Sequence, residues 1–200
     1  GEYRLAQNKV VIPSDSGLGE GDVSAYIRQK PNSSWLFGWN PMLYVYNWSV
    51  REKSFVHKIG TAPVVFDSLS VGTSLANIRN RLEYLGWYGS VVTPQIDRYG
   101  KNVKVSYIIS PGKRYLVNSL IWDIPSGGEF AADFLADSTA MTEATVGRYL
   151  SEKDLETESA RSAARLRDLG YFSLNKNNYS FEADTMPDGT ATLIYKIGRA

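Results

Sequence analysis

Apolar residues recur along this chain at two periods, one typical of helices and one typical of strands. In residues 74–88 (SLANIRNRLEYLGWY) the apolar side chains stand three or four residues apart, which is the period of one helix face. They are Leu75, Ile78, Leu82 and Leu85. Residues 155–172 (LETESARSAARLRDLGYF) repeat the pattern. The residues of that face are Leu155, Ser159, Ala163, Leu166 and Leu169. Two amphipathic helices are therefore predicted.

The ends of both helices carry recognisable signals. Each helix closes with Leu-Gly followed by two aromatic residues, and Gly86 and Gly170 are expected to adopt the left-handed conformation that ends a helix. Ser151 and Asp154 have the spacing of a capping box at the start of the second helix. The aromatic pair after each glycine should begin an extended segment.

Alternating apolar residues predict strands around both helices. Val103, Val105, Tyr107 and Ile109 alternate as a half-buried strand requires. Asp188-Gly189 is a hairpin signal between two such segments. The first copy has strands at 3–12, 90–96 and 102–109, and the second has strands at 113–124, 177–183 and 190–197. Short helices are expected at 22–30 and 129–136.

The order of these elements is β-α-α-β-β, and it occurs twice. The expected fold class is α+β, with two tandem domains that are each a three-stranded mixed sheet with two helices on one face. The first domain is expected at residues 1–110 and the second at 111–200, joined at Ser110-Pro111-Gly112. About 40 residues separate the two helices of the first copy, which places an insertion at about 31–72.

Aromatic residues concentrate in this insertion, in WLFGWNPMLYVYNW (35–48). Trp35, Trp39, Tyr46 and Trp48 are the main candidates for a docking surface there. One interpretation is that they cover the small first domain, since small domains bury little surface. The second is a docking face for a partner or a membrane surface, because basic residues lie nearby. The third is a small-molecule pocket.

Composition excludes several classes of protein. Lys plus Arg total 22 and Asp plus Glu total 21, and a net charge of +1 gives no electrostatic case for binding nucleic acid. The absence of cysteine excludes disulfides and thiol catalysis. A single histidine, His57, offers neither a triad base nor a zinc site. No catalytic residue, metal site or cofactor is predicted.

The charged residues of the second helix have structural explanations. Glu152, Asp154, Glu156 and Glu158 crowd its start, where they favour the positive end of the helix dipole. Arg161, Arg165 and Arg167 are expected on a solvated face, with Glu158 as a close partner for Arg161. No apolar run is long enough for a transmembrane helix. Gly1 and the strand-like end suggest a piece of a longer protein.

The ordered motifs resemble the POTRA domain, the periplasmic repeat of outer-membrane barrel assembly and translocation proteins of the BamA and TamA type. The resemblance is carried by Leu85-Gly86-Trp87-Tyr88, the strand 103–109, Pro111-Gly112-Lys113-Arg114-Tyr115, and Leu169-Gly170-Tyr171-Phe172. It covers nearly the whole chain. The opening (NKVVI, YIRQKPN, LYVYNW, KIGTAPVVFD) looks like versions from Bacteroidetes-type bacteria.

The resemblance implies a non-catalytic periplasmic module, attached to the outer membrane through a parent protein with a C-terminal membrane barrel. It implies partners that are unfolded outer-membrane or translocated polypeptides, or accessory periplasmic proteins. Such a module would bind by adding a client strand to a sheet edge. The edge residues expected to bind are Val91, Val92 and Thr93 in the first domain, and Tyr179, Ser180, Phe181 and Glu182 in the second.

Pro94 lacks an N–H and should partly block the first edge, so the second edge is expected to be the better one. Two alternatives remain open. One is a membrane-surface or accessory-protein docking module that uses the aromatic insertion. The other is a periplasmic hydrolase that acts through carboxylates, which would need a concave pocket with convergent acidic groups.

Overall fold

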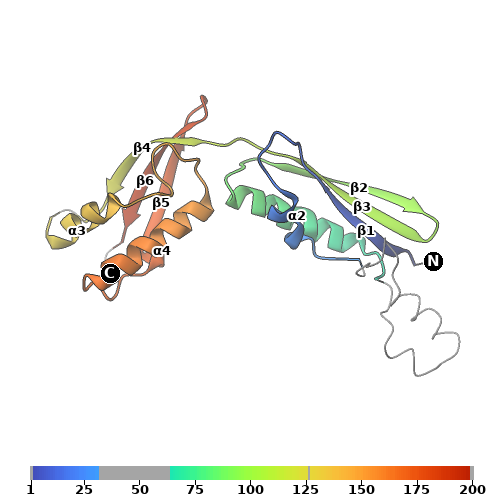
Figure 1. Ribbon diagram of the computed structural model, residues 1–200, viewed down its shortest axis with the longest axis horizontal. Coiled ribbons are helices and arrows are strands. Elements are labelled where there is room, and N and C mark those ends of the chain that lie inside the picture. Colours follow the sequence, from blue (N-terminus) through green and yellow to red (C-terminus); the bar gives the residue numbers. More distant parts are fainter. Residues whose placement is uncertain (1, 32–63, 126, 199–200) are drawn as a thin grey trace, which may run out of the picture. The chain divides into compact units, whose positions relative to one another are not determined.

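A computed structural model of the chain describes residues 2–31, 64–125 and 127–198, which form two compact units (Figure 1). The first unit comprises Gly1–Arg81 and Val91–Ser110. The second comprises Leu82–Ser90 and Pro111–Ala200. A short segment of the second unit therefore precedes the last two strands of the first unit in the sequence.

The first unit contains a three-stranded mixed sheet. Its strands are β1 (Arg4–Val11), β2 (Val91–Tyr99) and β3 (Asn102–Ser110), in the order β1-β3-β2. β3 is parallel to β1 and antiparallel to β2, so β2 and β3 form the predicted hairpin. The alternating residues of β3 are buried on one face of the sheet, as their pattern predicted.

Helix α2 (Ser68–Tyr84) lies along one face of this sheet (Figure 1). It begins six residues before the predicted start, because Asp67 caps it: the amides of Leu69 and Ser70 donate to the Asp67 carboxylate at 3.0 and 3.1 Å. The Ser70 hydroxyl also donates to this carboxylate, at 2.6 Å. That hydrogen bond first, and then those from the two amides, lower the pKa of Asp67. Residues 68–72 therefore belong to the helix rather than to the insertion.

Residues 22–30, where the sequence predicted a helix, are a second difference between prediction and structure. The structure has two 3-10 turns there, Glu20–Asp22 and Ser24–Tyr26. Glycines precede this segment and Pro31 follows it, and the residue before a proline is disfavoured in helical conformation, so the chain has room only for short turns. The turns still bury Val23 and Ile27.

The second unit repeats the sheet. Its strands are β4 (Leu116–Asp123), β5 (Tyr179–Thr185) and β6 (Thr190–Ile197), in the order β4-β6-β5, with β4 parallel and β5 antiparallel to β6. Helices α3 (Glu129–Ser138) and α4 (Glu152–Asp168) both lie on one face of this sheet (Figure 1). The predicted α+β class, with two three-stranded mixed sheets, is confirmed.

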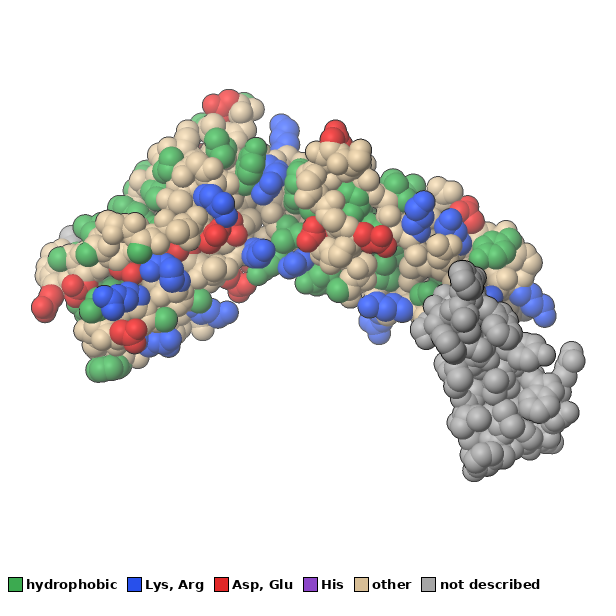
Figure 2. Space-filling view, viewed as in Figure 1, with side chains coloured by type: hydrophobic (Ala, Val, Ile, Leu, Met, Phe, Trp, Pro, Cys, Tyr) green, Lys and Arg blue, Asp and Glu red, His purple; other side chains and the backbone are tan. Residues whose placement is uncertain are grey.

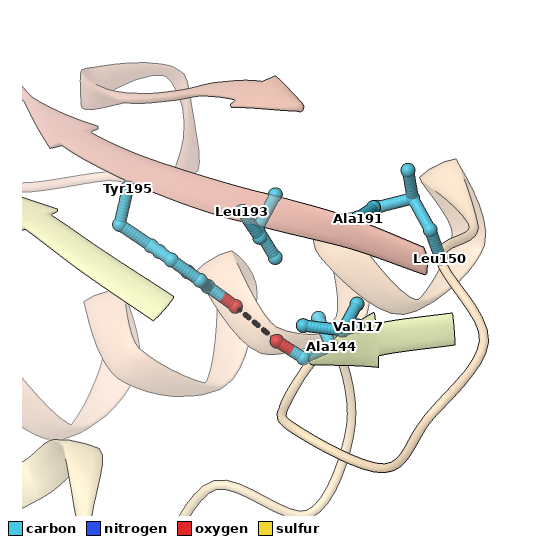
Figure 3. Close-up of a cluster of buried hydrophobic side chains, with 6 residues drawn as sticks. All are labelled: Val117, Ala144, Leu150, Ala191, Leu193 and Tyr195. Atoms are coloured by element: carbon cyan, nitrogen blue, oxygen red, sulfur yellow. Dashed lines mark hydrogen bonds between the residues drawn. The ribbon is translucent and has the colours of Figure 1, made fainter. Parts of the chain in front are cut away.

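The core of the second unit lies between this sheet and the helices. One cluster, drawn in Figure 3, contains Val117, Ala144, Leu150, Ala191, Leu193 and Tyr195. The Tyr195 hydroxyl donates to the Ala144 carbonyl at 2.9 Å, so its polar end is satisfied although the ring is buried. Burial raises the pKa of this phenol well above its ordinary range.

The predicted helix ends are confirmed. The Ser151 hydroxyl accepts a hydrogen bond from the Asp154 amide at 3.1 Å and caps α4. Gly86 and Gly170 have φ of 90° and 107°, the left-handed conformation that a helix-ending glycine was expected to adopt.

Arg161 does not lie on a solvated face, contrary to prediction. Its guanidinium forms bonds of 2.9 and 3.0 Å to the carboxylate of Asp137 on α3, and of 2.6 and 3.1 Å to that of Glu158. Both carboxylates are buried. The sequence pattern of α4 did not predict the pairing of Arg161 with Asp137, because Asp137 lies on another helix. Arg161 is therefore a partly buried link between α3 and α4, and its predicted pairing with Glu158 is confirmed.

None of the described helices has the length and apolar character needed to cross a bilayer. Lys and Arg side chains alternate with Asp and Glu on the visible face of each unit (Figure 2). That face shows no concentration of one sign of charge over the described residues.

Candidate polypeptide-binding edges

Strands β2 and β5 each lie at an edge of their sheet. They carry all the residues that sequence analysis selected as edge residues: Val91, Val92 and Thr93 on β2, and Tyr179, Ser180, Phe181 and Glu182 on β5. Within the described residues, no backbone hydrogen bond joins the outer side of either strand to another segment. Each edge therefore has backbone N–H and C=O groups available to an extended chain.

The opposite edges are partly covered by their own chain. At the start of β1, the Leu5 amide donates to Val64 and the Phe66 amide donates to Tyr3, both at 2.8 Å. At the start of β4, the Val117 amide donates to Arg148 at 2.9 Å. The two sheets are thus asymmetric, with one edge partly sealed and one open.

The two open edges differ in their surroundings. Nearly every side chain of β2 is exposed, and Pro94 has no N–H to offer. On β5, by contrast, Tyr179 is buried and the Phe181 ring packs edge-on against Tyr195 with centroids 4.7 Å apart. β5 is therefore firmly fixed on its inner side, which gives a rigid template for an added strand.

A pocket of about 510 Å³ lies beside β5, wholly within the second unit. Phe181, Glu182, Ala183 and Thr185 of β5 line one side of it. The remaining lining residues are Glu83, Tyr88, Tyr115, Leu150, Glu152, Leu155 and Leu193. The pocket is thus mainly apolar and lies directly next to an open sheet edge.

One wall of this pocket is built by the segment 82–90. The Tyr88 amide donates to the Lys113 carbonyl at 2.9 Å, and the Lys113 amide donates back at 2.8 Å. The Gly112 amide donates to the Ser90 hydroxyl at 2.9 Å. A Cβ on Gly112 would overlap the Tyr88 carbonyl, so only glycine allows this close approach.

The same wall gives a physical reason for two sequence motifs, Leu85-Gly86-Trp87-Tyr88 and Pro111-Gly112-Lys113-Arg114-Tyr115. The Arg114 guanidinium lies 4.8 Å from the Trp87 ring centroid and 4.1 Å from that of Tyr149, a pair of cation–π contacts. A Cβ on Gly86 would overlap the Leu150 carbonyl. The Leu-Gly-aromatic and Pro-Gly-Lys-Arg-Tyr motifs are thus two halves of one packed joint within the second unit.

The electrostatics of the pocket are acidic. Burial, followed by the nearby carboxylates of Glu152 and Glu83, raises the pKa of the Tyr88 phenol. Neither Glu83 nor Glu152 forms an ion pair with a described residue. The sequence did not predict the pocket, because its residues come from five separate segments that only the fold brings together.

The structure also bears on the other sequence-based candidates. Trp35, Trp39, Tyr46 and Trp48 lie outside the described residues, as does His57. No group of three or more histidine, aspartate or glutamate residues in the described part of the chain is arranged to hold a metal ion.

Similar proteins were found among solved structures. No protein-family model matches the sequence, and no curated protein matches it. Among solved structures, the chain matches POTRA1-2 of the periplasmic domain of Omp85 from Anabaena, with a TM-score of 0.42 and 15% identity, covering 100% of this chain and 98% of that one. It matches POTRA3-5 of BamA from Haemophilus influenzae with a TM-score of 0.39 and 11% identity, covering 100% and 97%.

The chain is similar to POTRA domains. A third match is BamA from Haemophilus ducreyi lacking POTRA domains 1-3, with a TM-score of 0.41 and 15% identity over 76% of this chain. The chain spans 27% of that BamA chain. The resemblance to Bacteroidetes-type versions stays a prediction.

Proposed function

We propose that this chain is a non-catalytic periplasmic module of an outer-membrane protein assembly or translocation factor, and that it binds extended polypeptides by adding them to a sheet edge. The observation that carries the proposal is the open edge of β5, which no described segment pairs on its outer side. Backbone pairing recognises an extended chain whatever its side chains, which suits varied clients.

β5 is proposed as the main edge and β2 as a weaker one. Tyr179, Ser180, Phe181 and Glu182 lie on a strand that is held by its inward side chains, and the backbone groups of Tyr179 and Phe181 face its open side. β2 carries Val91, Val92 and Thr93 but also Pro94, which removes one possible donor. The proposed partners are unfolded barrel precursors or translocated polypeptides, with accessory periplasmic proteins as further partners.

The proposal is tested by photo-crosslinking a denatured outer-membrane barrel precursor to variants of the chain. Ala183→Pro should weaken crosslinking about two- to tenfold, the equivalent of one lost hydrogen bond of ~0.5–1.5 kcal/mol. The Ala183 N–H points to the open side of β5, because the Gly198 amide donates to Asn178 and the Met186 amide donates to Thr190, which directs the even-numbered backbone groups of β5 to β6. The matched control Ala183→Ser keeps the backbone N–H and should crosslink like wild type. Unchanged crosslinking in Ala183→Pro, with circular dichroism showing an intact fold, would refute β5 as the binding edge.

A carboxylate-dependent hydrolase is the competing class, and the pocket beside β5 does contain glutamates. All three of them are exposed, whereas a general acid working near neutral pH needs a carboxyl that its surroundings keep protonated. Glu182 is in addition paired with Lys196 at 2.6 Å. Liposome flotation of wild type against Trp35→Ala/Trp39→Ala tests the other alternative, docking on a membrane surface.

A further inference from the structure

The position of the pocket relative to β5 restricts what an added strand can present to it. Side chains of a strand alternate between its two faces. Phe181 faces the helices, because it packs against Tyr195, so Ala183 and Thr185 share that face and line the pocket. A residue paired opposite them on an added strand would have its side chain on the same face, beside the pocket.

The charges of the pocket come from two carboxylates. Glu182 alternates to the opposite face of β5, where its carboxylate pairs with Lys196 at 2.6 Å. The carboxylates left to the pocket are those of Glu83 and Glu152, neither of which has an ion-pair partner among the described residues. A cation that entered beside the apolar lining would therefore meet two carboxylates that form no direct ion pair with a described residue, although Arg114 also lies near Tyr88.

We propose that this pocket receives one large apolar side chain of the strand added to β5, and that the preferred strand carries Lys or Arg two residues away from it. The spacing follows from geometry, since same-face neighbours on a strand are two residues or about 6.6 Å apart. The apolar side chain would contact Tyr88, Phe181 and Leu155, and the cation would lie near Glu83 or Glu152. This inference rests on the proposed function, because it takes β5 as the edge that pairs.

Anionic partners fit this site poorly. A phospholipid headgroup or a nucleic acid phosphate would approach the same two carboxylates and be repelled. A basic, apolar polypeptide segment is the occupant that matches both the lining and the charge. The pocket would thus add side-chain selectivity to backbone pairing, which by itself does not discriminate among sequences.

The test compares short β-forming peptides by fluorescence anisotropy on the full chain. The first peptide carries Phe-Thr-Lys, the second Phe-Thr-Gln, and the third Phe-Lys-Thr, in which the cation moves to the opposite face. Wild type should bind the first about two- to fivefold more tightly than the other two, as expected for an exposed ion pair. In about 1 M salt, where the screening length is about 3 Å, the preference should vanish.

Variants of the chain test whether the tighter binding of the Phe-Thr-Lys peptide depends on the pocket. Glu83→Gln/Glu152→Gln should bind all three peptides equally. Glu129→Gln is the matched control, since Glu129 opens α3 as Glu152 opens α4 but does not line the pocket, and it should keep the preference. Ala183→Phe should fill the pocket and reduce binding of the Phe-Thr-Lys peptide to that of an Ala-Thr-Lys peptide.

The outcomes separate this inference from the proposed function. If wild type binds all three peptides equally while Ala183→Pro weakens all of them, strand addition stands and the selective pocket is wrong. If no peptide binds wild type, both are wrong. If tyramine alone binds as tightly as the Phe-Thr-Lys peptide, the pocket takes a small amine and the inference is overturned. A preference that survives in Glu83→Gln/Glu152→Gln would also overturn it.

Discussion

Replacing Arg161 tests how the helices of the second unit are held together. Arg161 lies between Asp137 on α3 and Glu158 on its own helix, and these two carboxylates are only 4% and 3% exposed. Arg161→Met keeps an unbranched apolar stem but removes the charge, so two buried carboxylates lose their cation. Such a loss costs about 3–5 kcal/mol, and because Arg161 itself is 32% exposed we expect about 3 kcal/mol.

The effect should depend on pH in a defined direction. In wild type, hydrogen bonds from Arg161 to Glu158 and then to Asp137 raise the pKa of the guanidinium, so its contribution is fully present near neutral pH, far below the pH at which arginine loses its proton. In Arg161→Met, the unpaired carboxylates bind protons more readily in the folded state than in the unfolded state. The variant should therefore regain stability as the pH falls, and the gap to wild type should narrow from pH about 8 to about 5.

Hydrogen exchange at the amides of β6 measures this stability for the second unit alone. Near pH 8, the midpoint of thermal unfolding should fall by roughly 12–24 °C. The matched control is Arg165→Met, an exposed arginine one turn further along α4, which should change stability by under about 0.5 kcal/mol. Adding Glu158→Gln to Arg161→Met should recover part of the loss. A gap that stays constant across this pH range, or a double variant less stable than the single one, would show that the carboxylates are not the cause.

Three further predictions concern packing, capping and titration. Gly112→Ala should destabilise the second unit by roughly 2 kcal/mol or more, because the new Cβ would overlap the Tyr88 carbonyl, and urea unfolding measures this. Ser151→Ala should cost about 1 kcal/mol by removing the cap of α4, whereas Ser151→Asp should cost little; thermal unfolding distinguishes them. The hydrogen bond to Asp133 raises the pKa of Tyr171 to about 12, and Asp133→Asn should return it toward about 10 in ultraviolet titration. Since that pKa is raised, the stabilisation from this bond is present below pH about 10 and is lost as the pH rises through about 12.

The strands and long helices could be predicted because their signals are local. β6 alternates over its whole length and β3 over most of it, and α4 has a serine cap at its start and a glycine after its end. Local signals failed where tertiary contacts decide. The helix expected at 22–30 is reduced to short turns, since it is confined between glycines and Pro31.

The sequence predicted the edge strands of the candidate site but not the pocket beside β5. The edge strands were implied by the resemblance to POTRA domains, in which the first strand of the hairpin lies at the sheet edge, and the strand orders β1-β3-β2 and β4-β6-β5 agree with it. The pocket could not be predicted, since Glu83 and Glu152 are far apart in the chain and meet only through the Tyr88–Lys113 pairing. Arg161 was misjudged for the same reason, as its partner Asp137 lies on a different helix.

The order of segments in the chain constrains how the molecule can be made and divided. Residues 82–90 are synthesised before β2 and β3, yet their partners at Gly112 and Lys113 leave the ribosome only after both strands. A single cut at Ser110 therefore cannot release an intact second unit, because the fragment that starts at Pro111 loses Tyr88 and the wall it forms. The two units are interlaced along the chain, so completion of the second must wait for synthesis of the last two strands of the first.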